Sequence, residues 1–261
     1  MNEFKNHTFA ICAYKESKYL EECIKSLKNQ NIKSNIIMAT STPNDYIKKL
    51  ADKYNIELFI NTGERGIGQD WNFAVSSCKT DYVTVAHQDD IYNKNFLEGI
   101  VKYLDSGKDF IISFGDYLEI KNGQTIPLTI NLKIKKFLLK PLIKNPEKKY
   151  AKMHAIKYGN GICCPSVTIN TKKCGKTPYL TDMKCDLDWD TWYKLSKKDG
   201  AFLYINKEIM CHRIHEESET TNLIENNIRL KEDYEMFKKF WPKPIAKFLV
   251  SFYKNATKTN S

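Results

Sequence analysis

The sequence lacks the features that mark membrane-spanning, secreted and zinc-binding chains. No apolar run reaches the roughly 20 residues of a membrane span, and the polar start Met1–Thr8 contains no signal-peptide core. Among the eight cysteines no pair has the two-residue spacing of a zinc knuckle. Cys12, Cys23 and Cys78 fall in apolar patterns typical of small core residues, which fits a reducing compartment. These absences predict a cytoplasmic protein.

Two common phosphate-binding signatures are also missing. The stretch from Gly66 to Trp71 fails the dinucleotide fingerprint, because Trp71 stands where the third glycine belongs. No P-loop occurs, in which a glycine-rich loop ends in Lys-Ser or Lys-Thr. The loop from Gly63 to Gly68 therefore has two open interpretations: a tight turn, or a close approach to a phosphate.

What the sequence has in excess is positive charge. Across 261 residues the formal net charge is +10, which favours acidic partners such as nucleotides, phosphates, nucleic acid or an anionic membrane. Lysines and aromatic residues interleave near the C-terminus, but no nucleic-acid-binding motif accompanies them, so no nucleic-acid partner is expected. The length allows one sizeable core with an appended subdomain.

Short apolar strands alternate with amphipathic helices through the first hundred residues. The predicted strands are Phe9–Ala13, Asn35–Ala39, Ile56–Ile60 and Tyr82–Ala86. The predicted helices are Lys18–Gln30, Asn44–Tyr54 with a cap at Ser41–Pro43, one starting near Trp71, and one over Asn93–Gly107. This alternation predicts a mostly parallel sheet with helices on both faces. The turns Tyr14–Ser17, Thr40–Thr42, Glu64–Gly68 and His87–Asp90 would then converge on one crevice at the carboxyl edge.

The last of these turns concentrates charge. A hydrophobic strand ends in His87, Gln88, Asp89 and Asp90, and two adjacent carboxylates repel unless a cation or hydrogen-bond donors compensate. Mg²⁺ takes oxygen ligands and keeps positions open for substrate phosphates. Two interpretations follow, a divalent metal site or a solvated turn that caps the next helix.

The middle of the chain changes character. Phe110–Phe114 predicts a strand and Asn122-Gly123 a hairpin turn, before a basic, apolar segment over Leu128–Lys157. Within it, Pro141 predicts that Leu132–Ile143 forms two short pieces, which either lie on an anionic membrane or pack on the core as a basic helix. Val167–Ile169 and Ala201–Asn206 predict a short strand and an edge strand.

Two further stretches gather charged side chains. Asp186, Asp188 and Asp190 alternate with apolar residues, and capping with solvation is the expectation for Asp186 and Asp190. A single carboxylate here can act as a base if it reaches a substrate hydroxyl. His212, Arg213 and His215 predict a loop that either binds a diphosphate or a metal, or is only salt-bridged.

The C-terminus is predicted to be helical over Asn226–Lys239. The aromatic, proline-broken stretch Phe240–Tyr253 follows, and membrane contact, packing on the domain and dimerisation all remain open for it.

The order of these motifs carries a family likeness. AYKES after the first strand, TSTPND after the second, GIGQDWNFA, HQDD, DLDWDTW and HRIHEES together resemble glycosyltransferase family 2 enzymes of the GT-A fold, of the bacterial cell-surface polysaccharide type. The likeness covers most of residues 8–222. It implies a GT-A domain over 1–222, with a nucleotide-binding half over 1–120 and an acceptor-binding half over 121–222 that contains the basic segment 128–157. A C-terminal helical extension over 223–261 would follow.

The resemblance also implies roles for single residues. Asp90 would ligate Mn²⁺ or Mg²⁺, Asp89 would contact the ribose or the metal, and Asp188 would be the base that deprotonates the acceptor. The residues implied in nucleotide-sugar binding are Tyr14, Glu16, Thr40, Arg65, Asn72, Asp89 and Arg213, and His215 would join Asp90 at the metal.

Five positions depart from the family pattern. Gln88 replaces the first acid of the metal motif, Thr40 and Ser41 hold the place of base-reading Asp residues, and Leu187 replaces the Glu before the base. Trp71 stands where an arginine precedes Asn72, for which Arg65 is the candidate substitute.

The resemblance as a whole implies an inverting, metal-dependent glycosyltransferase. Such an enzyme moves a sugar from a nucleoside diphosphate sugar to a glycan hydroxyl, here with a lipid-linked acceptor at the inner face of the cell membrane as one possibility. A non-catalytic nucleotide-sugar-binding module and a nucleotidyltransferase are the alternatives.

Overall fold

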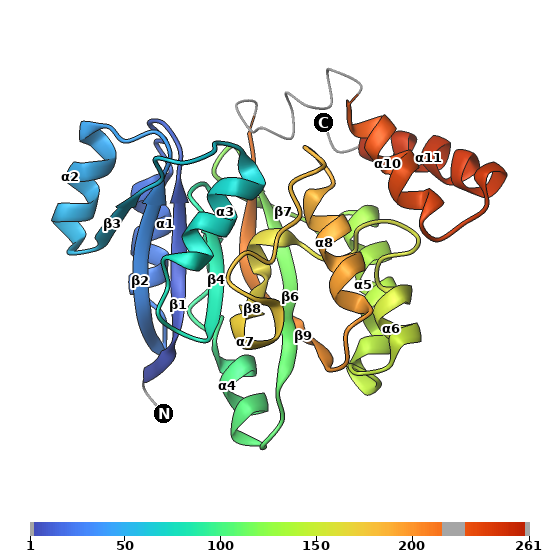
Figure 1. Cartoon of the computed structure of the whole chain (residues 1–261), viewed down its shortest axis with the longest axis horizontal. Coiled ribbons are helices and arrows are strands. Elements are labelled where there is room, and N and C mark those ends of the chain that lie inside the picture. Colours follow the sequence, from blue (N-terminus) through green and yellow to red (C-terminus); the bar gives the residue numbers. More distant parts are fainter. Residues whose placement is uncertain (1–2, 216–227, 259–261) are drawn as a thin grey trace.

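The protein is seen here as a computed structural model that describes residues 3–215 and 228–258 (Figure 1). The strands are β1 (Glu3–Ala13), β2 (Lys33–Thr40), β3 (Glu57–Ile60), β4 (Tyr82–His87), β5 (Ile91–Tyr92), β6 (Phe110–Lys121), β7 (Gln124–Ile126), β8 (Thr168–Asn170) and β9 (Ala201–Ile214). The helices are α1 (Leu20–Lys28), α2 (Asp45–Tyr54), α3 (Ile67–Ser76), α4 (Glu98–Asp105), α5 (Ile130–Lys144), α6 (Lys149–His154), the 3₁₀ turn η1 (Cys164–Ser166), α7 (Thr171–Cys174), α8 (Leu187–Ser196), α10 (Ile228–Lys238) and α11 (Lys243–Lys258).

One mixed sheet runs through the described part of the chain, in the order β3-β2-β1-β4-β8-β6-β9-β5, with β7 paired to β6. In its first half β1 pairs in parallel with β2 and β4, so that Ile11 lies between Met38 and Ala86. All three side chains are buried, as the apolar runs predicted. The short strand β8 is antiparallel to both β4 and β6 and joins this half to the parallel pair β6 and β9.

Helices cover both faces of the sheet (Figure 1). One core lies between the sheet and α3 and α8, with Val75, Trp189 and Trp192 fully buried. The other lies under α1, α2 and α4, where Leu20 and Ile47 are fully buried. The predicted architecture of a mostly parallel sheet between two helical layers is confirmed.

The structure confirms the predicted hairpin turn, and it confirms the start of the second predicted helix but not the position of its cap. Asn122 and Gly123 both have positive φ, 52° and 77°, and they join β6 to β7 as the predicted hairpin. Helix α2 does begin where a cap was expected, but the cap is Asn44, whose side-chain oxygen accepts from the Ile47 N–H at 2.9 Å. Ser41–Pro43 precede that cap.

Two predictions from the sequence are wrong. Pro141 does not divide the basic segment, because α5 is continuous from Ile130 to Lys144 with Pro141 inside it. Pro141 lies near the helix end, and the buried Leu138, Leu139 and Leu142 pack on both sides of it. His212 and Arg213 do not lie in a loop, because β9 extends to Ile214 beside β6. By contrast, within the described part of the chain the residues from Ala201 to Ile205 pair with β6 alone, since β5 reaches only Met210 and Cys211, so the start of β9 lies at the edge of the sheet as predicted.

The C-terminal extension is helical. The amphipathic helix expected over 226–239 is present as α10, and Phe240–Tyr253 contributes a further helix, α11, that starts after Pro242. Residues 216–227, which include the end of HRIHEES, lie outside the described part. Within the described residues none of the helices has both the length and the apolarity to cross a membrane.

Candidate active site

The turns that follow β1, β2 and β4 meet at the carboxyl edge of the sheet, as predicted. Gln88 joins two of them: its Oε1 accepts from the Tyr14 backbone N–H at 2.9 Å, and its Nε2 donates to the Tyr14 carbonyl at 3.0 Å. The Lys15 backbone N–H donates to Thr42 Oγ1 at 2.6 Å. Gln88, which replaces an acid of the family pattern, thus fastens the turn after β1 to the turn after β4.

A candidate metal centre lies next to Gln88, in the turn after β4. Ligand atoms of His87, Asp89 and Asp90 lie within 4.8 Å of one another. Asp90 is completely buried, and its Oδ1 accepts from the Arg213 backbone N–H at 2.9 Å and bonds His212 Nδ1 at 3.0 Å. Within the described residues neither Asp90 Oδ2 nor His87 Nε2 has a hydrogen-bond partner, although both are buried. Because such buried atoms are normally paired, this donor set of one imidazole and two carboxylates fits a divalent cation.

The electrostatics of the cluster keep its donors in the form that binds a cation. Burial lowers the pKa of His87, so that its ring stays neutral and its nitrogen can act as a ligand. Burial opposes ionisation of Asp89, but the hydrogen bond from His215 and the charge of the nearby His212 hold the pKa of Asp89 below its usual value. Burial also opposes charge on His212, yet the Asp90 carboxylate raises the pKa of His212 to about 9. A protonated His212 thus partly neutralises the cluster.

Arg213 and His215 support the turn between β4 and β5. Arg213 Nε donates to the Asp89 carbonyl at 2.8 Å, its Nη2 pairs with Glu22, and its guanidinium lies 4.3 Å from the centroid of the Tyr19 ring. His215 Nε2 lies 2.9 Å from Asp89 Oδ2. Both residues are therefore at the candidate metal centre, in contact with Asp89. Diphosphate binding by Arg213 and metal ligation by His215 stay predictions.

The residues predicted at the nucleotide differ in exposure. Tyr14 is 47% exposed, and Glu16 and Arg65 are also exposed. Thr40 is buried, and its Oγ1 accepts from the Thr42 N–H at 3.0 Å, so that it shapes the turn after β2. The open ring of Tyr14 is available to stack on a base.

A carboxylate nevertheless stands beside the turn after β2. Asp70 of α3 accepts from Ser41 Oγ at 2.7 Å and from Asn61 Nδ2 at 2.8 Å. The fixed carboxylate has further lone pairs for an N–H donor. Its neighbour Asn72 makes two bonds with the Tyr179 backbone, both 2.9 Å, which tie α3 to the segment before α8. The predicted nucleotide contact of Asn72 remains a prediction.

Asp188 lies in the first turn of α8, the helix predicted to start near it. Its Oδ1 accepts from the Trp189 N–H at 2.7 Å and its Oδ2 from Asn160 Nδ2 at 2.8 Å. Burial raises the pKa of Asp188, while these two hydrogen bonds and the charges of Arg229 and Lys135 oppose that rise. A carboxylate with a raised pKa is a better proton acceptor than an ordinary Asp.

The expectation of capping and solvation for Asp186 and Asp190 is wrong. Asp186 is buried and makes no side-chain cap bond. The Asp186 backbone N–H donates instead to the carboxylate of Glu232 in α10, at 3.1 Å. Asp190 is also buried and pairs with Lys239 Nζ at 2.6 Å. Helix α10 and the residues after it, distant in sequence, provide both partners, so no local pattern announced them.

For two residues of the site, His87 and Asp70, the sequence predicted no role. His87 ends β4 one residue before Gln88, and its place in the same turn as Asp89 was the available signal. Asp70 lay inside GIGQDWNFA, but only the fold brings it to Ser41 and Asn61.

The family model of glycosyl transferase family 2 matches residues 8–174. The chain belongs to glycosyltransferase family 2. Curated relatives include an uncharacterized glycosyltransferase of Methanocaldococcus jannaschii, MJ1057, which is 27% identical over 213 residues and 78% of this chain, covering 69% of that protein. The abequosyltransferase RfbV of Salmonella typhimurium is 29% identical over 129 residues, which are 44% of this chain and 39% of that protein.

Solved glycosyltransferase structures share the fold of this family 2 chain. TarS residues 1–349 from S. aureus superpose with a TM-score of 0.64 at 14% identity, covering 95% of this chain and 69% of that one. The mannosyltransferase PcManGT from Pyrobaculum calidifontis, solved with GDP-Man and Mn²⁺, superposes with a TM-score of 0.62 at 13% identity, covering 94% and 68%. The predicted GT-A fold is confirmed.

Proposed function

We propose that the chain is an inverting, metal-dependent glycosyltransferase that moves a sugar from a nucleoside diphosphate sugar to a glycan hydroxyl in cell-surface polysaccharide synthesis. The observation that carries the proposal is Asp90. It is completely buried at the crevice edge of the sheet, and its Oδ2 has no partner within the described residues, beside His87 and Asp89. Relatives of this fold were solved with UDP-GlcNAc and with GDP-Man and Mn²⁺, which supports the donor class and the cation.

On the donor side, His87, Asp89 and Asp90 would hold Mn²⁺ or Mg²⁺, with His215 next to them. When bound, such an ion offsets the charge that develops on the leaving diphosphate. The exposed Tyr14 ring stacks on the base, and the Asp70 carboxylate accepts a hydrogen bond from a base N–H. Glu16, Thr40, Arg65, Asn72, Asp89 and Arg213 complete the nucleotide-sugar site.

On the acceptor side, Asp188 removes the proton from the attacking hydroxyl. The oxygen forms a bond to the anomeric carbon from one face while the bond to the diphosphate oxygen breaks on the other. The proton ends on Asp188, and the nucleoside diphosphate leaves with the bond's electrons. This single displacement inverts the anomeric configuration, and holding the two substrates in line supplies much of the acceleration.

A thermal-shift panel tests these roles. Nucleoside diphosphate sugars with and without Mn²⁺ are compared on the wild-type chain, Asp90→Ala, Asp188→Ala and the control Asp105→Ala, whose side chain is exposed on α4. We expect metal-dependent stabilisation in the wild type, the control and Asp188→Ala, and its loss in Asp90→Ala. A wild-type chain that no nucleotide sugar stabilises would contradict the donor assignment. Stabilisation without any transfer would favour a binding module, and a product of retained configuration would contradict the role of Asp188.

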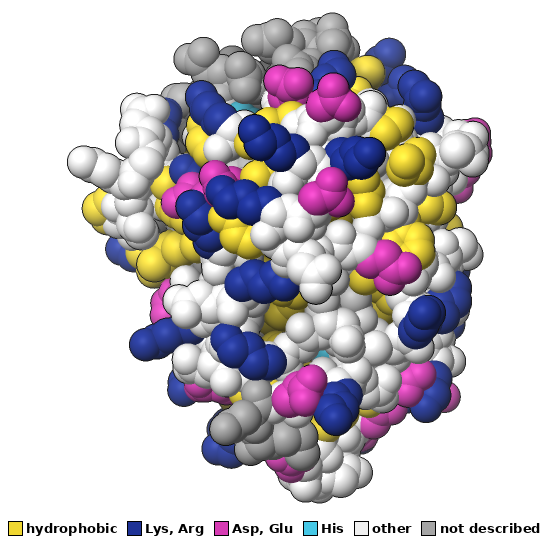
Figure 2. Space-filling model, turned by 90° about the vertical axis from the view of Figure 1, so that its left-hand side faces the viewer, with side chains coloured by type: hydrophobic (Ala, Val, Ile, Leu, Met, Phe, Trp, Pro, Cys, Tyr) yellow, Lys and Arg dark blue, Asp and Glu magenta, His cyan; other side chains and the backbone are white. Residues whose placement is uncertain are grey.

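The acceptor proposed here is a lipid-linked glycan at an anionic membrane surface. Helices α5 and α11 lie at one end of the molecule, on the right of Figure 1, and expose Ile130, Ile134, Phe137, Ile143, Ile245, Phe248 and Phe252. Lysines accompany these side chains, and neither helix contains a carboxylate. At the opposite end Figure 2 shows lysines and acids interspersed and only scattered hydrophobic side chains.

Vesicle sedimentation at low salt tests the membrane proposal. We expect binding to vesicles that contain phosphatidylglycerol, weaker binding to purely zwitterionic ones, and loss of binding in Phe137→Ser/Phe248→Ser. If the wild-type chain failed to sediment with the anionic vesicles, the membrane proposal would be wrong, while the transferase proposal would stand.

A further inference from the structure

The Glu232 carboxylate of α10 binds three backbone N–H groups at the amino end of α8. Glu232 Oε2 accepts from the Cys185 N–H at 2.7 Å and from the Asp186 N–H at 3.1 Å, and Oε1 accepts from the Lys184 N–H at 2.9 Å. These donors sit directly before the helix that contains Asp188. Since Asp186 makes no cap bond with its own side chain, Glu232 satisfies donors that the local sequence leaves open.

Apolar packing supports this attachment. Met236 and Phe237 of α10 are fully buried, and the Phe237 ring packs edge-on to Trp189 with centroids 5.1 Å apart. Trp189 directly follows Asp188 and donates its backbone N–H to that carboxylate at 2.7 Å. A displacement of α10 would therefore be felt one residue from the proposed base.

Helix α10 also brings a charge to Asp188. Arg229 lies on the same helix, one turn before Glu232, and its guanidinium acts on the Asp188 carboxylate. Lys135 of α5 is the other cation that does so. Burial chiefly raises the pKa values of Asp186, Cys163, Cys164 and Tyr179, and the Asp188 carboxylate in turn raises them further. Burial disfavours the ionised form of Asp188, and the charges of the two cations oppose that effect.

We propose that α10 is a working part of the acceptor site, in which Glu232 fastens the helix to the start of α8 and Arg229, so held, acts on Asp188 as a positioning residue. The inference rests on the proposed role of Asp188 as base. It assigns to the C-terminal extension a part in the reaction, because Asp188 receives the charge of Arg229 only when α10 is packed against α8.

The test compares Arg229→Met, Glu232→Gln and Glu232→Ala with a matched control on the same helix. Glu235→Ala is that control, because Glu235 is half exposed and pairs with Lys238 within α10. The acid limb of the kcat/KM profile should move to higher pH in Arg229→Met and Glu232→Ala, because each takes the cation away from Asp188. Glu232→Gln keeps an accepting oxygen and should stay close to wild type. In Glu232→Ala we also expect kcat at neutral pH to fall about 10- to 100-fold, with KM for the donor unchanged.

A purely structural α10 gives a different result. In that case Glu232→Ala lowers the melting temperature while Arg229→Met leaves the acid limb where it is in the wild type, and the proposal is overturned. Carbon-13 NMR of the Asp188 carboxyl, assigned with Asp188→Asn, follows the same titration without turnover. A titration that shifts in Arg229→Met in a chain without transferase activity would keep the electrostatic coupling and refute the proposed function instead.

Discussion

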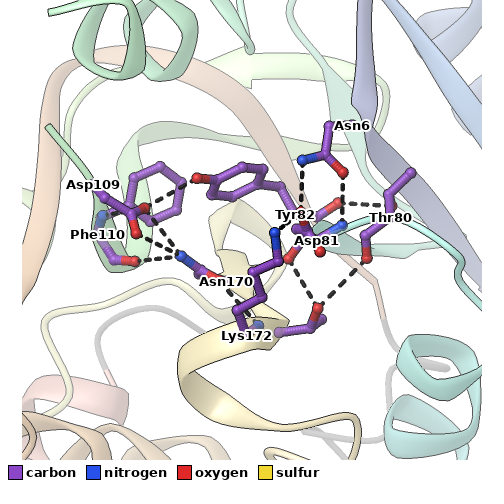
Figure 3. A network of polar contacts seen from close by, with 9 residues as sticks. Asn6, Thr80, Asp81, Tyr82, Asp109, Phe110, Asn170 and Lys172 are labelled. Atoms are coloured by element: carbon purple, nitrogen blue, oxygen red, sulfur yellow. Dashed lines mark hydrogen bonds and ion pairs between the residues drawn. The ribbon is translucent and has the colours of Figure 1, made fainter. Parts of the chain in front are cut away.

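The amino edge and the carboxyl edge of the sheet both contain aspartates, but these aspartates have different roles. At the amino edge, shown in Figure 3, Asp81 accepts from Asn6 Nδ2 at 2.8 Å and pairs with Lys172 at 2.7 Å. Asp109 accepts from Tyr82 Oη and from Asn170 Nδ2, both at 3.0 Å. These contacts join the ends of β1, β4, β6 and β8, and both carboxylates have cationic or hydrogen-bonding partners on the protein itself.

At the carboxyl edge one carboxylate, that of Asp90, is more deeply buried and less completely paired. Asp90 is inaccessible to solvent and its Oδ2 has no partner among the described residues, whereas Asp81 is paired although its side chain is 27% exposed. Burial of an unpaired polar atom costs free energy, about 1–3 kcal/mol for a neutral group and more for a charged one. The contrast teaches that unused bonding capacity, rather than the presence of acids, distinguishes the binding edge from the structural edge.

The largest expected effect is on catalysis at Asp188. Asp188→Asn keeps the shape and an accepting oxygen but removes the proton acceptor, so kcat should fall by about 10²- to 10⁴-fold. Initial-rate kinetics with a saturating donor measure it. Donor-dependent thermal stabilisation should remain, and a variant that keeps most of its kcat would rule out Asp188 as base.

Asp90→Asn comes next. The amide oxygen can still accept from Arg213 and His212, but the neutral side chain loses its affinity for a divalent ion, so kcat/KM should fall by about 10²- to 10³-fold. Titration of Mn²⁺ against activity checks the cause, since the apparent metal affinity must weaken. Asp81→Asn is the matched control at the other edge and should alter stability but leave the metal affinity unchanged.

Asn170→Ala should weaken the amino edge and leave the carboxyl edge unchanged. The Asn170 amide is buried and donates to Asp109 and to the Phe110 carbonyl, and its oxygen caps α7. Its loss should cost about 1–3 kcal/mol of unfolding free energy. Urea unfolding measures the loss, and kcat per folded molecule should stay at the wild-type value. A large fall in kcat without a change in stability would erase the proposed division between the edges.

The smallest effect is expected from lowering the pH, to which the carboxylates of the two edges should respond differently. Lys172 and Asn6 lower the pKa of Asp81, and Lys173 and Tyr82 lower the pKa of Asp109 against its burial. Their stabilisation is therefore present above the usual Asp pKa and is lost only as pH falls through the lowered values. Burial raises the pKa of Asp188, so the base is protonated earlier. Paired kcat/KM and urea-midpoint profiles should show activity falling before stability, and a coincident loss would contradict this order.

Much of the fold could be predicted because its signals are local. Apolar runs of strand length and amphipathic helices alternate through His87. The spacing of the apolar residues was therefore enough to predict the parallel half of the sheet and the crevice at its carboxyl edge. Asp90 and Asp188 could be proposed from their motifs for the same reason. The signal at Pro141 failed because the buried leucines around it outweigh one lost backbone hydrogen bond.

The rest depends on partners that are far away in the sequence. His212 and Arg213 lie in a strand because β6 pairs with them, and Glu232 reaches Asp186 across 46 residues. Asp70 gains its place only when β2 and α3 are assembled beside Asn61. In each case the residue type was visible, but the neighbour that gives it a role was not.

The position of β8 has a consequence for synthesis on the ribosome. This three-residue strand joins β4 to β6, yet it follows β6 in the chain by almost fifty residues. The first four strands can assemble as soon as they emerge, since β1, β2, β3 and β4 pair with one another, whereas β6 must wait for Thr168–Asn170 before it can join them. Until then the β4 edge is an open template for pairing with another chain. The nascent chain is thus most exposed to misassembly while the basic segment that precedes β8 is being translated.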